Sequence, residues 1–430
     1  MSTTPLRYSA PLLELCTLAL AEVAQFTYPA DAVLSRFFRI HREAGRQDRA
    51  LVAETVYAAL RRWRLLQAIV PEGPEAAGSG MRQLVLAAWI IQLGASPKDL
   101  QGALKSGELE WAAGVEARAR AAQPFEVQCD LPDWLIASLR LRWDDDTLLR
   151  HAAALQRPAP LDLRVNLLKR SRDEVLAQLR AEGIAAEATP YSPAGIRLRG
   201  HPAINRHALF LAGEIEVQDE GSQLLSWLVE PRRGEMIMDL CAGAGGKTLA
   251  LGALMHSTGR LYAFDVSARR LEKLRPRLAR SGLQNVHIQR IESERDTRVK
   301  RLAGKIDRVL VDAPCSGLGT LRRNPDLKMR QTPQSVAELR VKQAAILDAA
   351  ATLPKPGGRL VYATCSLLKE ENEEVVAAFL ERHRQFSLRP AAEIMQRQKL
   401  AVDMAGEFFE LWPAQHGTDA FFAAVLERKG

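Results

Sequence analysis

Two cysteines stand where an active site built on a β-sheet would use them. The segments DAPCSG (312–317) and ATCS (363–366) each end a predicted strand, and Cys315 and Cys365 are each followed by serine. If the two strands are neighbours in a parallel sheet, both thiols lie at the same edge. A single cysteine is usually a small buried hydrophobe, but two at strand ends indicate a nucleophilic thiolate, whose pKa helix N-termini and basic neighbours would lower.

A glycine-rich turn precedes these segments. The sequence DLCAGAGGKT (239–248) follows a predicted strand and ends in Gly-Lys-Thr, as a phosphate-binding loop does. Such a loop needs a glycine where this chain has Cys241, so the match fails at a residue on which the loop depends. Gly243, Gly245 and Gly246 still predict a sharply bent backbone that approaches a ligand closely.

Asp312 has two interpretations. It follows the apolar residues VLV, as the magnesium-binding acid of a P-loop ATPase does, but here it has no intact phosphate-binding loop to serve. An acid beside two thiols is better suited to a site that activates a pyrimidine. The ATPase stays an alternative, which magnesium-dependent nucleotide binding would distinguish.

Asp265 ends the next predicted strand, nineteen residues after Gly246. An acid at this place can accept hydrogen bonds from the two hydroxyls of a ribose. Alone, it could equally be an acid at the start of a helix, beside Ser267. Together with the glycine turn it favours a nucleoside ligand, either NAD or S-adenosylmethionine, and the GxGxxG spacing of a dinucleotide site is absent.

The elements that position these residues begin after a helical region. Apolar residues three and four apart predict helices over 11–26, 31–42, 48–70 and 81–94, with a loop over 72–80. The first 120 or so residues are therefore expected to form an all-α bundle.

A different pattern follows, over roughly 125–220. It predicts a strand over 161–168, a helix with Ser171 as N-cap, and a hairpin around the Ser-Pro-Ala-Gly at 192–195, which together suggest a small α/β domain. From about residue 230, strands and helices alternate, which predicts a parallel sheet with helices on both faces. The expected fold class is a multidomain chain: an all-α N-terminal bundle, a small α/β linker domain and a C-terminal α/β domain.

Composition narrows the class of partner. The chain of 430 residues has 59 Lys and Arg against 51 Asp and Glu, a net charge of +8 and a pI near 9.3. This balance and several arginine-dense segments favour a polyanion, RNA above all. We expect no spanning helix, no secretory signal and no membrane partner. Five scattered cysteines without CxxC spacing argue against zinc and disulfides, so no metal and a reduced, cytoplasmic location are expected.

The motifs resemble one family closely. IDRVLVDAPCSGLGT and YATCS, with DLCAGAGGKT upstream, are similar to the Sun/RsmB (NOL/NOP) family of RNA (cytosine-5)-methyltransferases over roughly 125–430. The first 125 residues resemble the helical NusB-type RNA-binding domain of bacterial members. The resemblance implies a class I methyltransferase (Rossmann-like) fold that uses S-adenosylmethionine. It divides the chain into a NusB-like domain (1–124), a small RNA-binding domain (125–222) and a methyltransferase domain (223–430).

The resemblance also assigns roles to single residues. Its cofactor loop falls on Cys241, Ala242, Gly243, Ala244, Gly245, Gly246 and Lys247. Its ribose-binding acid falls on Asp265, and its motif IV acid, which belongs to both the cofactor and the catalytic set, falls on Asp312. The nucleophile, the cysteine of the TC motif, falls on Cys365, and the cysteine of the PC motif falls on Cys315.

Three positions depart from the family pattern. The cofactor loop has Gly243-Ala244 where Ala-Pro is usual, which makes the loop less rigid. Where an acid after the third strand often contacts the adenosine, this chain has Ile291, with Glu292 beside it. Met329 replaces a common tryptophan at a possible RNA contact.

The expected function is therefore the transfer of a methyl group from S-adenosylmethionine to carbon 5 of a cytosine in RNA. By family, small-subunit (16S) ribosomal RNA is the first candidate, with transfer RNA and large-subunit RNA behind it. Arg164 and Asn166 match an RNA-contacting RxN element. A non-catalytic RNA-binding scaffold is the alternative from another class, but it gives no reason for two strand-end cysteines. A DNA methyltransferase would normally use the PC cysteine alone. A monomer is expected.

Overall fold

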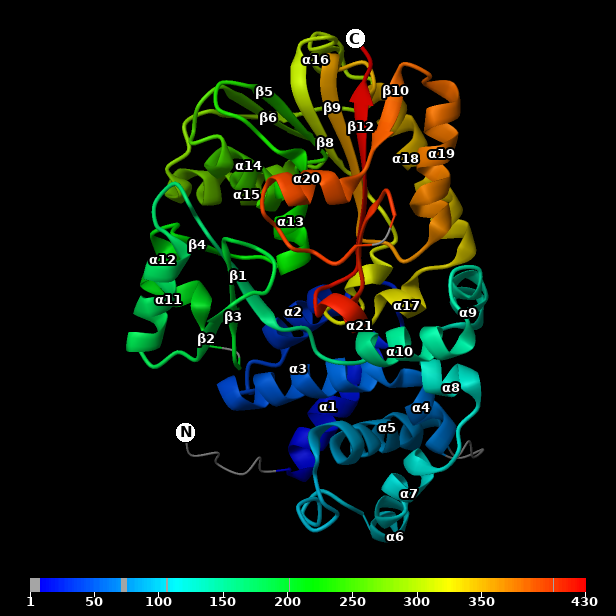
Figure 1. Cartoon of the computed structure of the whole chain (residues 1–430). Coiled ribbons are helices and arrows are strands. Elements are labelled where there is room, and N and C mark those ends of the chain that lie inside the picture. The colour runs from blue at the N-terminus through cyan, green and yellow to red at the C-terminus, as the bar shows by residue number, and fades with distance from the viewer. Residues whose placement is uncertain (1–7, 71–75, 106, 201, 405) are drawn as a thin grey trace. The chain divides into compact units, whose positions relative to one another are not determined.

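The computed structural model describes residues 8–70, 76–105, 107–200, 202–404 and 406–430 (Figure 1). The chain divides into two compact units. Unit 1 comprises Met1–Pro158 and Thr320–Thr332, and unit 2 comprises Ala159–Gly319 and Pro333–Gly430. Within the described ranges, no helix is long and apolar enough to cross a membrane.

The described part of unit 1 contains helices and no strand. Its helices are α1 (Ala10–Val23), α2 (Ala30–Ile40), α3 (Arg46–Arg61), α4 (Trp63–Ile69), α5 (Ala76–Leu93), α6 (Glu108–Ala113), α7 (Val115–Arg120), α8 (Phe125–Cys129), α9 (Asp133–Arg140), α10 (Asp145–Leu155) and α17 (Leu327–Arg330). Over the first 120 or so residues this agrees with the predicted all-α bundle, whereas α8, α9 and α10 fall in the region predicted to begin the small α/β domain. One apolar core joins α1 to α5, with Phe37 and Trp89 fully buried in it.

Two further details of unit 1 differ from the prediction. Of the predicted loop over 72–80, residues 72–75 lie outside the described residues, and residues 76–80 form the start of α5. The single helix predicted over 48–70 is interrupted at Arg62, because the buried Asp130 carboxylate accepts the backbone N–H groups of Arg64 and Leu65 and so caps α4 as a separate helix.

Unit 2 begins with a small antiparallel sheet in the order β2-β3-β1-β4. Its elements are β1 (Leu161–Val165), α11 (Arg172–Ala181), β2 (Ala186–Ala188), β3 (Gly195–Leu198), η1 (Ile204–Arg206), α12 (Ala208–Leu211) and β4 (Ile215–Val217). The predicted hairpin is confirmed by the β2–β3 pairing, and Ser171 caps α11 in a capping box with Glu174. The prediction lacked β4, a three-residue strand that pairs with β1.

The rest of unit 2 forms a larger mixed sheet in the order β10-β12-β9-β8-β5-β6-β7, with β11 paired to β12. Its elements are α13 (Glu220–Val229), β5 (Met236–Leu240), α14 (Gly246–Leu254), β6 (Arg260–Asp265), α15 (Ala268–Ser281), β7 (Val286–Arg290), α16 (Thr297–Lys300), β8 (Ile306–Asp312), η2 (Leu318–Thr320), α18 (Pro333–Ala350), β9 (Pro354–Thr364), η3 (Lys369–Glu371), α19 (Glu373–Arg382), β10 (Phe386–Arg389), α20 (Ala391–Arg397), β11 (Phe409–Leu411), α21 (Pro413–His416) and β12 (Phe421–Arg428). Strands β5 to β9 are parallel as predicted, but β10, β11 and β12 are antiparallel, so the expectation of a purely parallel sheet is wrong.

Both faces of the larger sheet are covered by helices, as Figure 1 shows. Successive residues of one strand point to opposite faces, so Met238 and Val311 pack towards α18 and α19, whereas Ile237 and Leu310 pack towards α13 and α14. All four side chains are fully buried. Burial on both faces explains why the centres of these strands are mostly apolar.

The strand order sets the place of a ligand site. From β5 the chain runs outwards through β6 and β7, then returns to the other side of β5 for β8 and β9. Ligands of such sheets bind at the carboxyl ends of the strands, near this reversal. Strands β8 and β9 are neighbours, with Asp312 opposite Ala363, so the segments that carry Cys315 and Cys365 leave the sheet at the same edge.

Candidate active site

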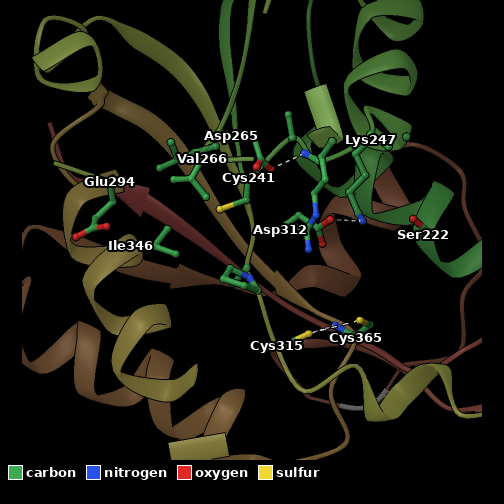
Figure 2. Close-up of a pocket in the computed structure, with 18 of the residues that line it drawn as sticks. Ser222, Cys241, Lys247, Asp265, Val266, Glu294, Asp312, Cys315, Ile346 and Cys365 are labelled. Atoms are coloured by element: carbon green, nitrogen blue, oxygen red, sulfur yellow. Dashed lines mark hydrogen bonds and ion pairs between the residues drawn. The ribbon is translucent and has the colours of Figure 1, made fainter. Parts of the chain in front are cut away.

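A cavity of about 720 Å³ opens at the carboxyl ends of β5, β6, β8 and β9 (Figure 2). Both sequence-predicted groups line it, the glycine turn at one side and the two thiols at the other. The lining comprises Gln218, Ser222, Leu240, Cys241, Ala242, Gly243, Ala244, Gly246, Lys247, Asp265, Val266, Arg270, Lys273, Ile291, Glu294, Asp312, Ala313, Pro314, Cys315, Leu339, Ile346 and Cys365. The fold therefore brings together residues from 218 to 365 in one site.

The turn between β5 and α14 has the sharply bent backbone that its glycines predict. Gly243 and Gly245 have φ of 56° and 83°. A Cβ on Gly245 would lie 2.0 Å from Leu274 Cδ1, so this glycine is required by the packing of α15 under the turn and does not line the cavity. Cys241 also has a positive φ, 95°, an uncommon conformation for a residue with a side chain.

Asp265 holds the turn from the adjacent strand end. Its Oδ2 accepts the backbone N–H of Gly243 at 2.8 Å, and its Oδ1 accepts the N–H of Ser267 at 2.7 Å. The carboxylate thus lies at the start of α15, as expected of an acid at a helix start. It also lies beside the glycine turn, as expected of an acid in a nucleoside site. Its binding of a ribose stays a prediction.

The thiol of Cys241 differs in its surroundings from the other two thiols of the cavity. Burial, followed by the charges of Asp265 and Asp312, raises the pKa of the Cys241 thiol well above its usual value. The thiol is therefore neutral at physiological pH, and its part in the cavity is that of a small apolar wall.

Lys247 and Asp312 form an ion pair across the cavity. Lys247 Nζ lies 2.7 Å from Asp312 Oδ2, as Figure 2 shows. Burial lowers the pKa of Lys247, but the charge and the hydrogen bond of Asp312 outweigh it, so this pKa stands above its ordinary value. The pair gives the site a fixed cation and a fixed acid beside the thiols.

The two predicted catalytic thiols are in contact. Cys315 Sγ and Cys365 Sγ are 3.4 Å apart, and the backbone N–H of Cys365 also points at Cys315 Sγ, at 3.4 Å. The side-chain hydrogen bond with Cys365 and then burial raise the pKa of Cys315 well above its usual value. These effects favour the neutral thiol form of Cys315.

Arg164 and Asn166 lie away from open solvent, although the sequence predicts that they contact RNA. The Arg164 guanidinium donates to the side chain of Gln218 and to the backbone oxygen of Gly246. Asn166 Nδ2 donates to the backbone oxygens of Gly213 and Ser281, at 2.9 and 2.8 Å. Burial lowers the pKa of Arg164 to about 10, so it stays charged at neutral pH. Their observed contacts join the small sheet to the glycine turn and to α15, and the RNA contact stays a prediction.

The family pattern often has an acid after the third parallel strand, at a position where this chain has Ile291. A nearby acid that was not predicted from the sequence lines the cavity instead. Ile291 lines the cavity and is buried, whereas Glu292 is exposed and pairs with Arg290 at 3.8 Å. Glu294, two residues further on, lines the cavity instead (Figure 2). No periodic signal marks it, because it belongs to the irregular turn between β7 and α16.

Comparison with known proteins gives the family of this site. A family model described as 16S rRNA methyltransferase RsmB/F matches residues 226–427, and a model of the ferredoxin-like domain of RsmF/B-like methyltransferases matches residues 131–205. The chain belongs to the RsmB/F methyltransferase family. The resemblance to this family is thereby confirmed, and strands β1, β2 and β3 of the small sheet lie in the part of the chain that matches its ferredoxin-like domain.

Two relatives and one solved structure show how far the similarity extends. A probable ribosomal RNA small subunit methyltransferase B of Synechocystis sp. is 37% identical over 302 residues, 70% of this chain and 67% of the relative. One of Bacillus subtilis is 31% identical, over 77% of this chain and 74% of the relative. The crystal structure of PH0851 is similar over 100% of both chains, with a TM-score of 0.76 and 26% identity.

This RsmB/F family member is an S-adenosylmethionine-dependent methyltransferase with a Rossmann-like C-terminal fold, and the cavity fits that cofactor. A Cβ on Gly243 would meet only the Cys241 oxygen, at 3.9 Å, so the bare backbone of the turn is open to a ligand. Asp265 supplies a carboxylate of the kind that binds ribose hydroxyls. The cofactor expected from the sequence is thereby confirmed.

Proposed function

We propose that this protein methylates carbon 5 of a cytosine in RNA, with small-subunit ribosomal RNA as the first candidate substrate. The observation that carries the proposal is the contact of the Cys315 and Cys365 sulfurs, 3.4 Å apart, in the same cavity as the glycine turn. The names of the relatives, ribosomal RNA small subunit methyltransferase B, support the substrate class.

Cys365 is the nucleophile in this proposal. Carbon 5 of cytosine is a poor nucleophile, and addition of a thiolate to carbon 6 breaks the aromaticity of the ring and places electron density on carbon 5. Cys365 lies at the carboxyl end of β9, with its side chain in the cavity lining. S-adenosylmethionine supplies an electrophilic methyl group on a sulfonium when it is bound.

Asp312 orients the base in this proposal. Its carboxyl group lines the cavity between the turn and the thiols and is one-third exposed, at 34%. As a carboxylate paired with Lys247, this group can accept a hydrogen bond from the exocyclic amino group at the ring edge and so position the base as the thiolate adds. Lys247 fixes the position of the acid through their 2.7 Å contact.

Cys315 assists release in this proposal. After carbon 5 has taken the methyl group, its proton passes to a base, a role that we assign to water in the open cavity. The electron pair of that C–H bond forms the carbon 5–carbon 6 double bond as the bond between carbon 6 and the Cys365 sulfur breaks. The sulfur then leaves with the electron pair of that bond. A thiol that stays protonated 3.4 Å from the leaving sulfur can donate a hydrogen bond or proton to it.

The remaining parts of the chain are assigned to RNA binding. Reaching carbon 6 requires an unstacked base, so the target should be single-stranded, looped or extruded from its helix. We assign backbone contacts to the helical region, which we take to be NusB-like, and to the ferredoxin-like domain. The domain boundaries at 124/125 and 222/223 stay a prediction, as does the choice of ribosomal over transfer RNA.

The experiment that tests the proposal is methylation followed by base identification. Purified protein is incubated with S-adenosylmethionine labelled in the methyl group and with separate in vitro transcripts of 16S, 23S and transfer RNA, and the products are sequenced after bisulfite treatment. We expect one bisulfite-resistant cytosine in 16S RNA with the wild type and none with Cys365→Ala. Label on another base or another atom, or wild-type activity of the variant, would contradict the proposal.

A further inference from the structure

A buried carboxylate lies directly behind the two thiols. Glu371, the last residue of η3, is 0% exposed. Its Oε1 accepts the backbone N–H of Ser316 at 2.8 Å and Nε2 of Gln343 at 2.9 Å, and its Oε2 accepts the hydroxyls of Ser316 and Ser366. The two serines are the residues that follow Cys315 and Cys365. One side chain thus holds both thiol-bearing segments.

The segment that carries Glu371 is itself fixed to the end of β9. The hydroxyl of Tyr362 donates to the backbone oxygen of Glu371 at 2.7 Å. The next residue, Asn372, donates from Nδ2 to the backbone oxygen of Ser366 at 3.1 Å and accepts the hydroxyl of Thr364 at 2.5 Å. All of these groups are buried, so the position of the carboxylate is determined by the sheet and not by a mobile loop.

Burying a carboxylate at this position costs desolvation free energy. A neutral side chain that only anchored the loop would not have this cost. Desolvation of an isolated charge is expensive, and it is offset only by donors that meet it with good geometry. The donors named above are neutral groups, and they come from the ends of β8 and β9 and from α18. After the hydrogen bond with Cys365 and burial, the charge of Glu371 also raises the pKa of Cys315.

We propose that Glu371 is a positioning residue for methyl transfer: by bridging Ser316 and Ser366, it keeps the Cys315 and Cys365 sulfurs in contact, so that Cys315 can assist the release of Cys365 from the base. This rests on the proposed function, because it presumes a covalent bond between Cys365 and cytosine. Glu371 touches neither substrate nor cofactor in this scheme. It acts through the two serines.

A purely structural role makes a different prediction. Loss of a loop anchor would lower the melting temperature and reduce every step of the reaction in the same proportion. Loss of the bridge should instead separate the two sulfurs, which slows the release of the adduct more than its formation. A misplacement on the order of 1 Å can cost about 100-fold in rate.

The test is a single-turnover experiment on 16S transcript, quenched at successive times and resolved on denaturing gels, which gives the rates of adduct formation and release separately. We expect Glu371→Ala to slow release about 10- to 100-fold, with formation changed about threefold at most. Glu371→Gln, which can still accept from the Ser316 backbone and meet both hydroxyls, should recover most of the release rate. Ser366→Ala removes one arm of the bridge and serves if Glu371→Ala does not fold.

A matched control is Glu230→Gln. Glu230 contacts Arg359 at 2.9 Å and Arg397 at 3.4 Å, near the opposite ends of the same strands, so its loss should lower stability without changing the ratio of the two rates. Equal slowing of formation and release in Glu371→Ala or Ser366→Ala, or a wild-type release rate, would overturn the proposal. If Cys315→Ala, in which release should be slowest, forms no adduct at all, the proposed function fails with it, and this outcome is distinct from the other two.

Discussion

Cys315 and Cys365 share one cavity but differ in what surrounds them. The hydrogen bond with Cys365, burial and the charge of Glu371 all favour the neutral form of Cys315. The cavity that Cys365 lines also contains a cation, Lys247. Burial lowers the pKa of Lys247, but Asp312 and then Cys365 raise it, so that it stands above its ordinary value. The neutral thiol of Cys315 fits the role of an acid at that position.

The ion pair of Lys247 with Asp312 gives a prediction at this scale. Asp312→Asn keeps the shape of the side chain but removes its charge and weakens its contact with Lys247, so we expect the rate of methyl transfer to fall about 100-fold, the effect of misplacing a reacting group by about 1 Å. Single-turnover methylation of 16S transcript with labelled cofactor measures it.

Asp307→Asn is a matched control for this variant. Asp307 lies in the same strand and pairs with Lys355 at 2.8 Å, near the end of the strand remote from the cavity. We expect this variant to methylate within about threefold of the wild type, because surface ion pairs contribute little. An Asp312→Asn enzyme as active as the Asp307→Asn enzyme would mean that Asp312 has no part in the chemistry.

Sequence reasoning found the residues that form patterns and missed those that do not. Cys315 and Cys365 were predicted to meet because each ends a strand, and they are in contact. Glu371 and Glu294 went unnoticed, because one follows its strand through a 3₁₀ turn and the other lies in an irregular turn. Arg164 was predicted to meet RNA, yet its guanidinium reaches the glycine turn, a contact that depends on how two sheets pack.

At the scale of elements, strand β5 carries an acid with an unusual environment. Asp239 is 1% exposed, its Oδ2 accepts the hydroxyl of Thr248 at 2.6 Å, and its Oδ1 has no hydrogen-bond partner among the described residues. Burial raises its pKa from 3.8 to about 7, against the hydrogen bond of Thr248. The carboxyl thus joins β5 to α14, directly under the glycine turn, in a largely protonated state below neutral pH.

This acid makes stability depend on pH. Since the pKa of Asp239 is raised in the folded state, the folded protein binds the proton more tightly than the unfolded chain does. The contribution of this group to the free energy of unfolding is therefore complete below about pH 4 and is lost as the pH rises towards 7. The asparagine of Asp239→Asn does not titrate, so this pH-dependent contribution is absent from the variant. We expect the melting temperature of the wild type, relative to this variant, to fall on the order of 5 °C between pH 5 and pH 8.

Calorimetry of both proteins at a series of pH values checks this. Parallel curves for the wild type and Asp239→Asn would show that the acid is ionised in the folded state throughout, and the account of its environment would be wrong.

How well the elements were predicted depended on local pattern. The alternation of strands and helices from β5 to β9 was correct, since most of these strands contain a short apolar run, as in MIMDL and VLV, near turn residues. Strands β4, β10 and β11 were not predicted, because three or four residues carry too little periodicity. Strand β12 reads FFAAVLER and is buried on both faces over its first six residues, so it lacks the alternation by which a strand is distinguished from a helix.

At the scale of the whole molecule, the net charge of +8 bears on partner binding. If affinity for RNA depends on contacts of Lys and Arg with phosphates, counterions are released on binding. We expect the affinity for 16S transcript to fall about tenfold or more between 50 and 200 mM salt. Filter binding across a salt series measures it, and binding of S-adenosylmethionine in the same series is the control. Affinity for RNA that is unchanged by salt would contradict this role of charge.

The central claim is that Cys365 bonds to the base and that Cys315 assists its release. The most direct measurement is a denaturing gel of the protein incubated with S-adenosylmethionine and 16S transcript, comparing Cys315→Ala, Cys365→Ala and the double variant. We predict a covalent adduct that accumulates only in Cys315→Ala, because there Cys365 still adds but leaves slowly. The absence of that adduct, or an adduct that persists in the double variant, would contradict the account.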